Sequence, residues 1–162
     1  NRRAFIGTVG SNPTPSAKFG INMSTTDNKD QNPHSLEVPP FLEILGFSGA
    51  HANDDETFTC EFNPGVNLTH SNGMIVQGGF VTGMLDSCMA QQLIFKSEGA
   101  LIPLTLDIDV KFFNACAPGP VVTVGKVIKQ GKSIAFTEAS LFQNDKLIAS
   151  STATNKLVPN RF

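Results

Sequence analysis

Hydrophobic and polar residues alternate along most of the second half of the chain, which is the pattern of half-buried β-strands. The longest alternating stretch is Leu101–Phe113. One face of this strand is expected to carry Leu104, Leu106, Ile108, Val110 and Phe112, and the other Thr105, Asp107, Asp109 and Lys111. Further strands are expected at Val121–Lys129, Ile134–Gln143 and Leu147–Val158, joined by short turns. The pattern predicts an antiparallel meander of long strands.

The first half of the chain predicts shorter elements. A helix is expected over Leu36–Leu45, because its proline pair fits a first turn and the glycine that follows fits a helix end. Strands are expected at Gly46–Ala52 and Thr57–Phe62. Residues 1–35 are rich in turn-forming residues without periodicity, which predicts an arm that is either disordered or clasps a neighbouring subunit. Residues 36–162 then suit a single domain.

The middle of the chain, Gly79–Ile94, has strong helical character. Its apolar residues go nearly all the way round the helix: Phe80, Val81, Met84, Leu85, Cys88, Met89, Leu93 and Ile94. A helix that is apolar on every side is expected to be buried, and Phe80, Met84, Leu85 and Met89 are expected to line an apolar pocket. Asp86 is the one carboxylate in this run. Burial of a charge is costly, so Asp86 needs a partner or a chemical role.

Small residues share one face of this helix with the carboxylate. Gly79, Gly83, Asp86 and Ala90 follow steps of four, three and four. Gly78 and Gly79 lie near the first turn, where free N–H groups could bind a carbonyl oxygen. Two interpretations stay open: close helix-to-sheet packing with an ion-paired or hydrated Asp86, or a ligand site on the bare face.

The order of elements predicts an α+β fold. A large antiparallel sheet with a single helix to cover it must curl around that helix. The net charge of −2 lacks the excess of basic residues that is typical of nucleic-acid-binding proteins. No apolar run approaches the ~20 residues that span a bilayer. The three cysteines lie far apart in apolar sequence, which predicts buried free thiols in the cytoplasm. The three histidines lack metal-ligand spacing, so no metal site is expected.

Four stretches of the chain resemble one family. NGMIVQGGFVTGMLDSCMA is similar to the helix signature of hot-dog-fold acyl-CoA thioesterases of the phenylacetic-acid-degradation type. LTLDIDVKFFNACAPG, KVIKQGKSIAFTEASLF and DKLIASSTATNKLVP resemble the strands of the same family, in order and with its spacings. The resemblance covers about Leu36 to Pro159. It implies a hot-dog fold, in which a long antiparallel sheet curls around one central helix.

The resemblance also implies catalytic roles. Asp86 matches the catalytic carboxylate, acting as general base on water or as nucleophile. Gly78 matches the residue whose backbone N–H polarises the thioester carbonyl, and Gly79 follows it at the helix start. Thr105 falls where the family often has a Ser or Thr that holds the attacking water. The helix N-terminus and Asp86 are expected to face the same carbonyl carbon, with the N–H groups stabilising the oxyanion.

The resemblance also implies residues that contact the substrate, and these match the family pattern less closely than the catalytic residues do. Gln77 stands where many members have His, and the family tolerates both residues. The loop Asn of the family falls at Ser71, and Asn72 is one residue late. The lysine turn, with Lys129, Gly131 and Lys132, matches the part that contacts the coenzyme A (CoA) nucleotide or phosphates; a solvated hairpin tip is the alternative.

The expected activity is hydrolysis of an aryl- or medium-chain acyl-CoA, with CoA as part of the substrate and no other cofactor. The expected assembly is a homodimer that shares active sites, or a dimer-of-dimers homotetramer. Three alternatives remain open: a non-catalytic acyl-CoA- or lipid-binding protein, a hydroxyacyl thioester dehydratase, which Gln77 at the His position argues against, and a purely structural oligomer.

Overall fold

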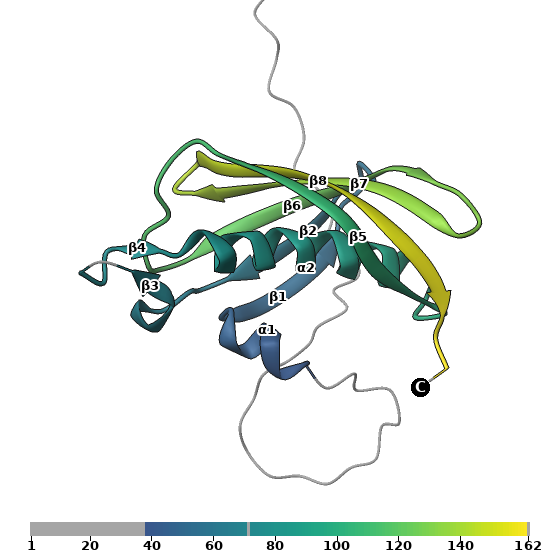
Figure 1. The fold of residues 1–162 in the computed structure, drawn as a ribbon, viewed down its shortest axis with the longest axis horizontal. Helices are drawn as coiled ribbons and strands as arrows, with labels where there is room; N and C mark the ends of the chain where they lie inside the picture. Colours follow the sequence, from purple (N-terminus) through teal and green to yellow (C-terminus); the bar gives the residue numbers. More distant parts are fainter. Residues whose placement is uncertain (1–37, 71, 162) are drawn as a thin grey trace, which may run out of the picture.

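A six-stranded antiparallel sheet carries the fold, and one long helix lies across one of its faces (Figure 1). The computed structural model describes residues 38–70 and 72–161. Its elements are α1 (Pro40–Ile44), β1 (Phe47–Ala52), β2 (Phe58–Phe62), the 3₁₀ turn η1 (Val66–Leu68), β3 (Thr69–His70), β4 (Ile75–Val76), α2 (Gly78–Lys96), β5 (Leu101–Phe112), β6 (Val121–Gln130), β7 (Ile134–Gln143) and β8 (Lys146–Pro159).

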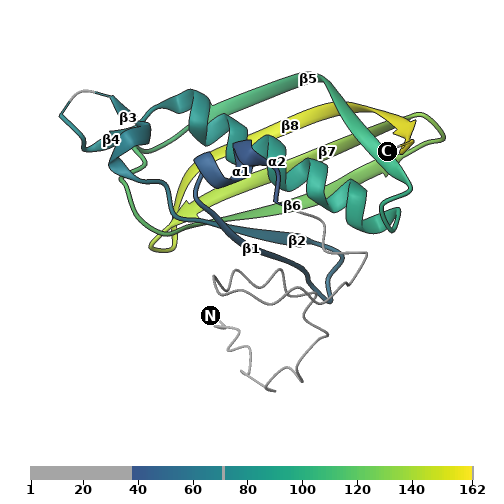
Figure 2. The same ribbon diagram turned by 90° about the horizontal axis from the view of Figure 1, so that it is seen from below.

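The strand order in the sheet is β1-β2-β6-β7-β8-β5. The hairpins β6–β7 and β7–β8 are the expected meander, whereas β5 pairs with β8 at the far side. Among residues 38–70 and 72–161, the strands at the two edges of the sheet are therefore β1 and β5, and Figure 2 shows them on opposite sides of α2. Strands β3 and β4 form a separate small hairpin just before α2. This is the hot-dog fold, as predicted.

The expected elements are confirmed to within a few residues. Helix α1 has a proline at its first position, and Gly46 follows it with φ +76°, the left-handed conformation of a helix stop. The β7–β8 turn places Asn144 and Asp145 at positive φ, as a two-residue hairpin requires. The predicted arm, residues 1–35, lies outside the described residues.

The core lies between α2 and the sheet. Met84, Leu85, Cys88 and Met89 have no exposed surface and pack with apolar residues of β2, β6, β7 and β8. The prediction that methionine and leucine side chains of α2 line a pocket is therefore wrong, because they point into this core. The prediction of burial on every side is also wrong in part, since the face with Gly79, Gly83, Asp86 and Ala90 is at least partly exposed.

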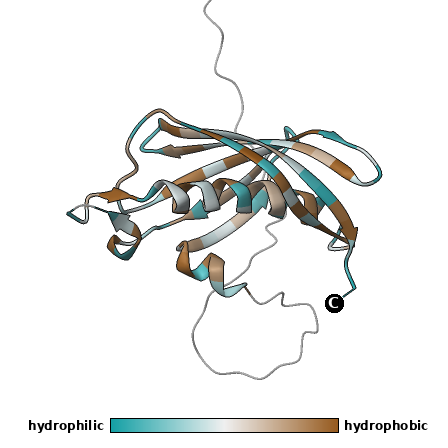
Figure 3. Ribbon diagram, viewed as in Figure 1, coloured by the Kyte–Doolittle hydropathy of each residue, from teal (hydrophilic) through white to brown (hydrophobic). Residues whose placement is uncertain are grey.

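A β-bulge in β5 corrects the predicted faces of that strand. Thr105 pairs with Asn155 and Asp107 pairs with Thr154, so Leu106 is an extra residue without a partner on β8. An extra residue reverses the alternation, so Thr105 shares the helix-facing side with Ile108 and Val110. Leu104 and Leu106, predicted to share a face with Ile108 and Val110, are 50% and 60% exposed. Figure 3 shows hydrophobic and hydrophilic bands that alternate along the strands of the sheet.

Replacing Gly46 with alanine is expected to destabilise the protein by about 2–4 kcal/mol. The left-handed conformation costs about 1–2 kcal/mol for a residue with a Cβ. A Cβ at Gly46 would also lie 2.6 Å from the carbonyl carbon of Asn63, so the backbone must shift, at a further ~1–3 kcal/mol. Gly99→Ala is the matched control, because Gly99 has φ +79° and its Cβ would meet nothing within 4 Å. Urea unfolding of both variants measures the difference; equal losses would contradict the steric account.

Candidate active site

The N-terminus of α2 is capped by a side chain from the chain itself. The Gln77 Oε1 atom accepts a hydrogen bond of 2.7 Å from the Gly79 N–H. The Gly79 N–H is thus occupied in this structure. The Gly78 N–H comes first in the helix and has no intrahelical acceptor, so it remains available to a ligand oxygen.

Asp86 has a hydrogen-bond partner on β5. The Thr105 hydroxyl donates to Asp86 Oδ1 at 2.8 Å, and both groups lie on a partly open side of the molecule. The bulge at Leu106 makes this contact possible, because without it Thr105 would face away from α2. The structure thus brings together two of the predicted catalytic residues.

Asn155 extends this pair into the interior. It is fully buried on β8, with Oδ1 at 3.3 Å from the Thr105 hydroxyl and Nδ2 donating to the Thr137 hydroxyl at 3.0 Å. Sequence reasoning missed Asn155 and Thr137. A signal was present, because Asn155 is a large polar residue at an inward position of a strand whose other inward residues are small or apolar.

The helix N-terminus and Asp86 of one chain cannot serve the same thioester. Gly78 and Asp86 are eight residues apart in one continuous helix, which corresponds to about 12 Å along its axis. The free N–H groups of the first turn also point away from Asp86 along the axis. The expectation that both groups of one chain face the same carbonyl carbon is therefore wrong on geometric grounds.

A hollow of about 350 Å³ opens beside the helix N-terminus. Its walls are mostly apolar and include Gly78, Val81, Phe112 and Cys116. Val81 and Cys116 are almost fully buried, whereas Phe112 is 53% exposed. This hollow adjoins the available Gly78 N–H and could take an apolar group bound there.

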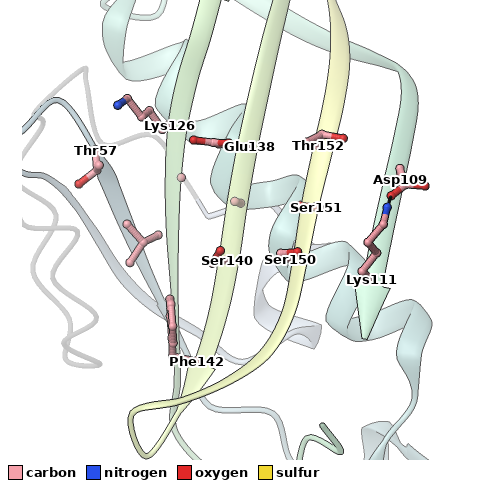
Figure 4. A pocket seen from close by; sticks show the side chains of 13 residues that line it. Thr57, Asp109, Lys111, Lys126, Glu138, Ser140, Phe142, Ser150, Ser151 and Thr152 are labelled. Atoms are coloured by element: carbon pink, nitrogen blue, oxygen red, sulfur yellow. Dashed lines mark hydrogen bonds and ion pairs between the residues drawn. The ribbon is translucent and has the colours of Figure 1, made fainter. Parts of the chain in front are cut away.

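A larger hollow of about 560 Å³ lies on the other face of the sheet, away from α2 (Figure 4). It is lined by hydroxyl groups and by charged groups of both signs, among them Lys126 and its strand partner Glu138. Asp109 and Lys111 form an ion pair at its edge. Because the sheet separates this hollow from Asp86, it takes no part in the candidate site.

The other predicted substrate contacts lie on loops. Ser71 is outside the described residues, and Asn72 lies in the β3–β4 turn with φ +75°. Lys129, Gly131 and Lys132 are exposed at the β6–β7 hairpin, which extends from the sheet in Figure 1. Thr105, Asn155, Ala135 and Gln130 are successive partners across β5, β8, β7 and β6, so this turn starts about 14 Å from Thr105.

The three cysteines are free and buried. The adjacent Cys88 thiol, followed by burial, raises the pKa of Cys60, and burial raises the pKa of Cys116. A thiol with a raised pKa stays protonated at neutral pH and is a poor nucleophile. Neither the Cys60 thiol nor the Cys116 thiol therefore competes with Asp86 for a catalytic role.

The described residues contain no group of three or more potential metal ligands. Within the same residues, no helix combines the length and the apolar character that a membrane crossing requires.

The sequence matches the acyl-CoA thioesterase N-terminal domain family over residues 68–156. This match includes α2, the Asp86–Thr105 pair and Asn155. The chain belongs to this family, and the protein is a thioester hydrolase. A search of the curated proteins found no match to the sequence.

Solved structures share the fold at low sequence identity. A phenylacetic acid degradation-related protein from Ralstonia eutropha JMP134 is 23% identical, with a TM-score of 0.69 over 76% of this chain and 93% of its own. Zebra fish thioesterase superfamily member 2 is 24% identical, with a TM-score of 0.63 over 75% and 89% of the two chains. A thioesterase from Haemophilus influenzae is 15% identical, with a TM-score of 0.66 over 74% and 82%.

Gln77→Ala is expected to lower the free energy of unfolding by about 1 kcal/mol, because it removes the side-chain cap from the Gly79 N–H. Gln91→Ala is the matched control, since Gln91 lies within α2 and away from its first turn. Urea unfolding followed by circular dichroism measures both variants. A loss for Gln77→Ala no greater than that for Gln91→Ala would show that the cap contributes nothing.

Proposed function

We propose that the protein hydrolyses an aryl- or medium-chain acyl-CoA to the free acid and CoA, with Asp86 as general base. The observation that carries this proposal is the hydrogen bond from the Thr105 hydroxyl to Asp86 Oδ1. It gives a carboxylate on a partly open surface a fixed orientation and a hydroxyl neighbour, which is what activation of a water molecule requires.

A water molecule between Asp86 and Thr105 would be the nucleophile. Its oxygen attacks the acyl carbon while Asp86 accepts one of its protons. The Thr105 hydroxyl can turn its proton to Asn155 Oδ1, which leaves its oxygen free to accept the second water hydrogen. The tetrahedral oxyanion then collapses, the carbon–sulfur bond breaks, and the CoA thiolate takes the proton from Asp86.

The oxyanion needs N–H donors that the same chain cannot supply near Asp86. We infer that the Gly78 N–H of a partner subunit is such a donor, so that the site forms between two copies of the chain. Loss of one such donor typically costs about 3 kcal/mol of transition-state stabilisation. The first-turn position of Gly78 supports this role, because its N–H has no intrahelical acceptor.

Strand β5 is the edge through which two copies would pair. It is a long free edge, and its exposed residues include Leu104, Leu106 and Phe112. The helix N-terminus lies against Phe112 of β5, because a Cβ at Gly78 would be 3.2 Å from the Phe112 ring. Asp86 lies against Thr105 of the same strand. The two halves of the proposed site therefore adjoin different positions on β5. Antiparallel pairing with Thr105 of the partner subunit opposite Phe112 would unite the halves. The two-fold axis then lies near the midpoint of 105 and 112, beside Asp109.

The polar part of the substrate would extend to the β6–β7 hairpin. Lys129 and Lys132 are exposed there, and lysine side chains bind phosphate as point charges. We place the protein in the cytoplasm, a proposal that its three buried free thiols support.

Asp86→Asn is expected to lower kcat about 10³-fold, because an amide cannot accept the water proton. Thr105→Val is expected to lower kcat about 10-fold, since it removes one hydrogen bond to the carboxylate and the water. The measurement is thiol release from a panel of aryl-acetyl, benzoyl, short- and medium-chain acyl-CoA substrates.

Asp107→Asn is the matched control for this series, because Asp107 is an exposed carboxylate that faces away from α2. It should retain full activity. Binding of acyl-CoA without thiol release by the unsubstituted protein would instead favour the non-catalytic binding protein.

Asp109→Cys is expected to give a covalent dimer under mild oxidation, because Asp109 lies beside the proposed two-fold axis. Non-reducing gel electrophoresis detects the dimer, and the native thiols are buried and should not interfere. Lys129→Cys is the control, since it is exposed but lies on the β6–β7 hairpin, away from the free edge. A monomeric protein at micromolar concentration, or equal cross-linking of both variants, would contradict the shared site.

A further inference from the structure

Thr137 is a buried polar residue on the inward face of β7. The other buried residues of this strand are apolar: Ala135, Ala139 and Leu141. Thr137 has no exposed surface, so its hydroxyl depends on partners within the protein. The hydroxyl oxygen accepts a hydrogen bond of 3.0 Å from Asn155 Nδ2, and the hydroxyl donates to the Ala153 carbonyl oxygen at 3.5 Å. Thr137 is therefore linked to the candidate site through Asn155.

These two contacts orient the side-chain amide of Asn155. The oxygen and the nitrogen of an amide have nearly the same shape, so hydrogen-bond partners decide which of them faces which neighbour. The Ala153 carbonyl can only accept, and Thr137 has a single hydroxyl proton. With that proton on Ala153, the Thr137 oxygen is left to accept from Nδ2. Asn155 Oδ1 then faces Thr105, at 3.3 Å from its hydroxyl oxygen.

The orientation of the amide decides what Thr105 can do. With Oδ1 toward it, Thr105 can donate its proton to Asn155 and keep its oxygen for a hydrogen of the attacking water. With Nδ2 toward it, the Thr105 oxygen would accept from the amide, and its one proton would stay on Asp86 Oδ1. A hydrogen bond to its ionised form makes a carboxylate a weaker base. The orientation with Oδ1 toward Thr105 is therefore the one that favours activation of water.

We propose that Thr137 is a positioning residue for the hydrolysis: its hydroxyl holds the Asn155 amide with the oxygen toward Thr105. This inference rests on the proposed function, because Thr137 acts on the attacking water through Asn155 and Thr105. Burial supports the role. Thr137 and Asn155 both lack exposed surface, so bulk water does not reach the amide to replace the Thr137 hydroxyl.

The test compares Thr137→Val with Thr137→Ser. Valine replaces the hydroxyl with a methyl group of similar size, and the amide is then expected to turn its nitrogen to Thr105, because a buried N–H without an acceptor is costly. We expect kcat to fall about five- to tenfold, the contribution of one hydrogen bond, while KM changes less than about twofold. Thr137→Ser keeps the hydroxyl and should keep kcat within about twofold of the unsubstituted protein. The measurement is thiol release from the member of the acyl-CoA panel that the unsubstituted protein hydrolyses fastest.

A double-mutant cycle separates positioning from a general effect on the core. Thr137→Val is made a second time, in the Thr105→Val background. Because the amide acts on the water through the Thr105 hydroxyl, the double variant should keep the kcat of Thr105→Val within about twofold. A loosened core would instead lower kcat by the same factor in both backgrounds.

Thr123→Val is the matched control. Thr123 is another threonine without exposed surface, on the adjacent strand β6, and its hydroxyl donates to the Cys60 carbonyl oxygen at 3.1 Å. This variant should keep full kcat. Circular dichroism checks that each variant is folded. If Thr137→Val does not fold, Thr137→Cys takes its place, because sulfur is a weak hydrogen-bond acceptor of similar size and should lower kcat in the same direction.

The outcomes distinguish this inference from the proposed function. A kcat that does not respond to Thr137→Val, an equal loss in Thr123→Val, an equal loss in Thr137→Ser, or an additive double-mutant cycle overturns the role of Thr137 and leaves the hydrolysis in place. An absence of thiol release by the unsubstituted protein, or full activity of Asp86→Asn, overturns the proposed function and the positioning role together.

Discussion

The packing of α2 on the helix-facing side of the sheet is the contact on which the rest of the structure depends. Met84, Leu85, Cys88 and Met89 of α2 are fully buried against residues of β2, β6, β7 and β8. This packing holds the helix as one rigid rod, with Gly78 at one end and Asp86 in the middle. The two chemical groups are therefore fixed about 12 Å apart along the helix axis, and no side-chain movement brings them together.

That fixed separation is the reason for the proposal that each protomer carries two half-sites. One half is Asp86 with the Thr105 hydroxyl, which can donate its one proton to Asp86 Oδ1 or to Asn155 Oδ1. The other half is the helix N-terminus with Phe112 beside it. Both halves lie along the free edge β5. Within the described part of the chain, β5 is a long edge strand without a second partner, and it carries exposed leucines. Such an edge promotes aggregation of a monomer and suits pairing with a second copy.

The bulge at Leu106 links the fold to the chemistry. Its single extra residue turns Thr105 toward Asp86 and, in the same step, turns Leu104 and Leu106 outward. The contact between Asp86 and Thr105 and the apolar surface of the edge thus have one structural cause. Asn155 is the strand partner of Thr105, and its buried Oδ1 would lose the Thr105 hydroxyl as a partner if the bulge were absent.

The sequence alone was sufficient for the elements, the one long helix, the β6–β7–β8 meander and the curled sheet, because each follows from local periodicity and turn residues. The place of β5 beside β8, instead of beside β6, did not follow from the sequence. The family motif also pointed to Asp86 and Thr105 before any geometry was available. Which residues of β5 face α2 could not be predicted, since a bulge is defined by the register with β8 and not by the composition of β5. The exposed face of α2, the burial of Asn155, the Phe112–Gly78 contact and the separation of the two half-sites were likewise decided only by tertiary structure. Periodicity specifies which residues share a face, whereas packing determines what that face meets.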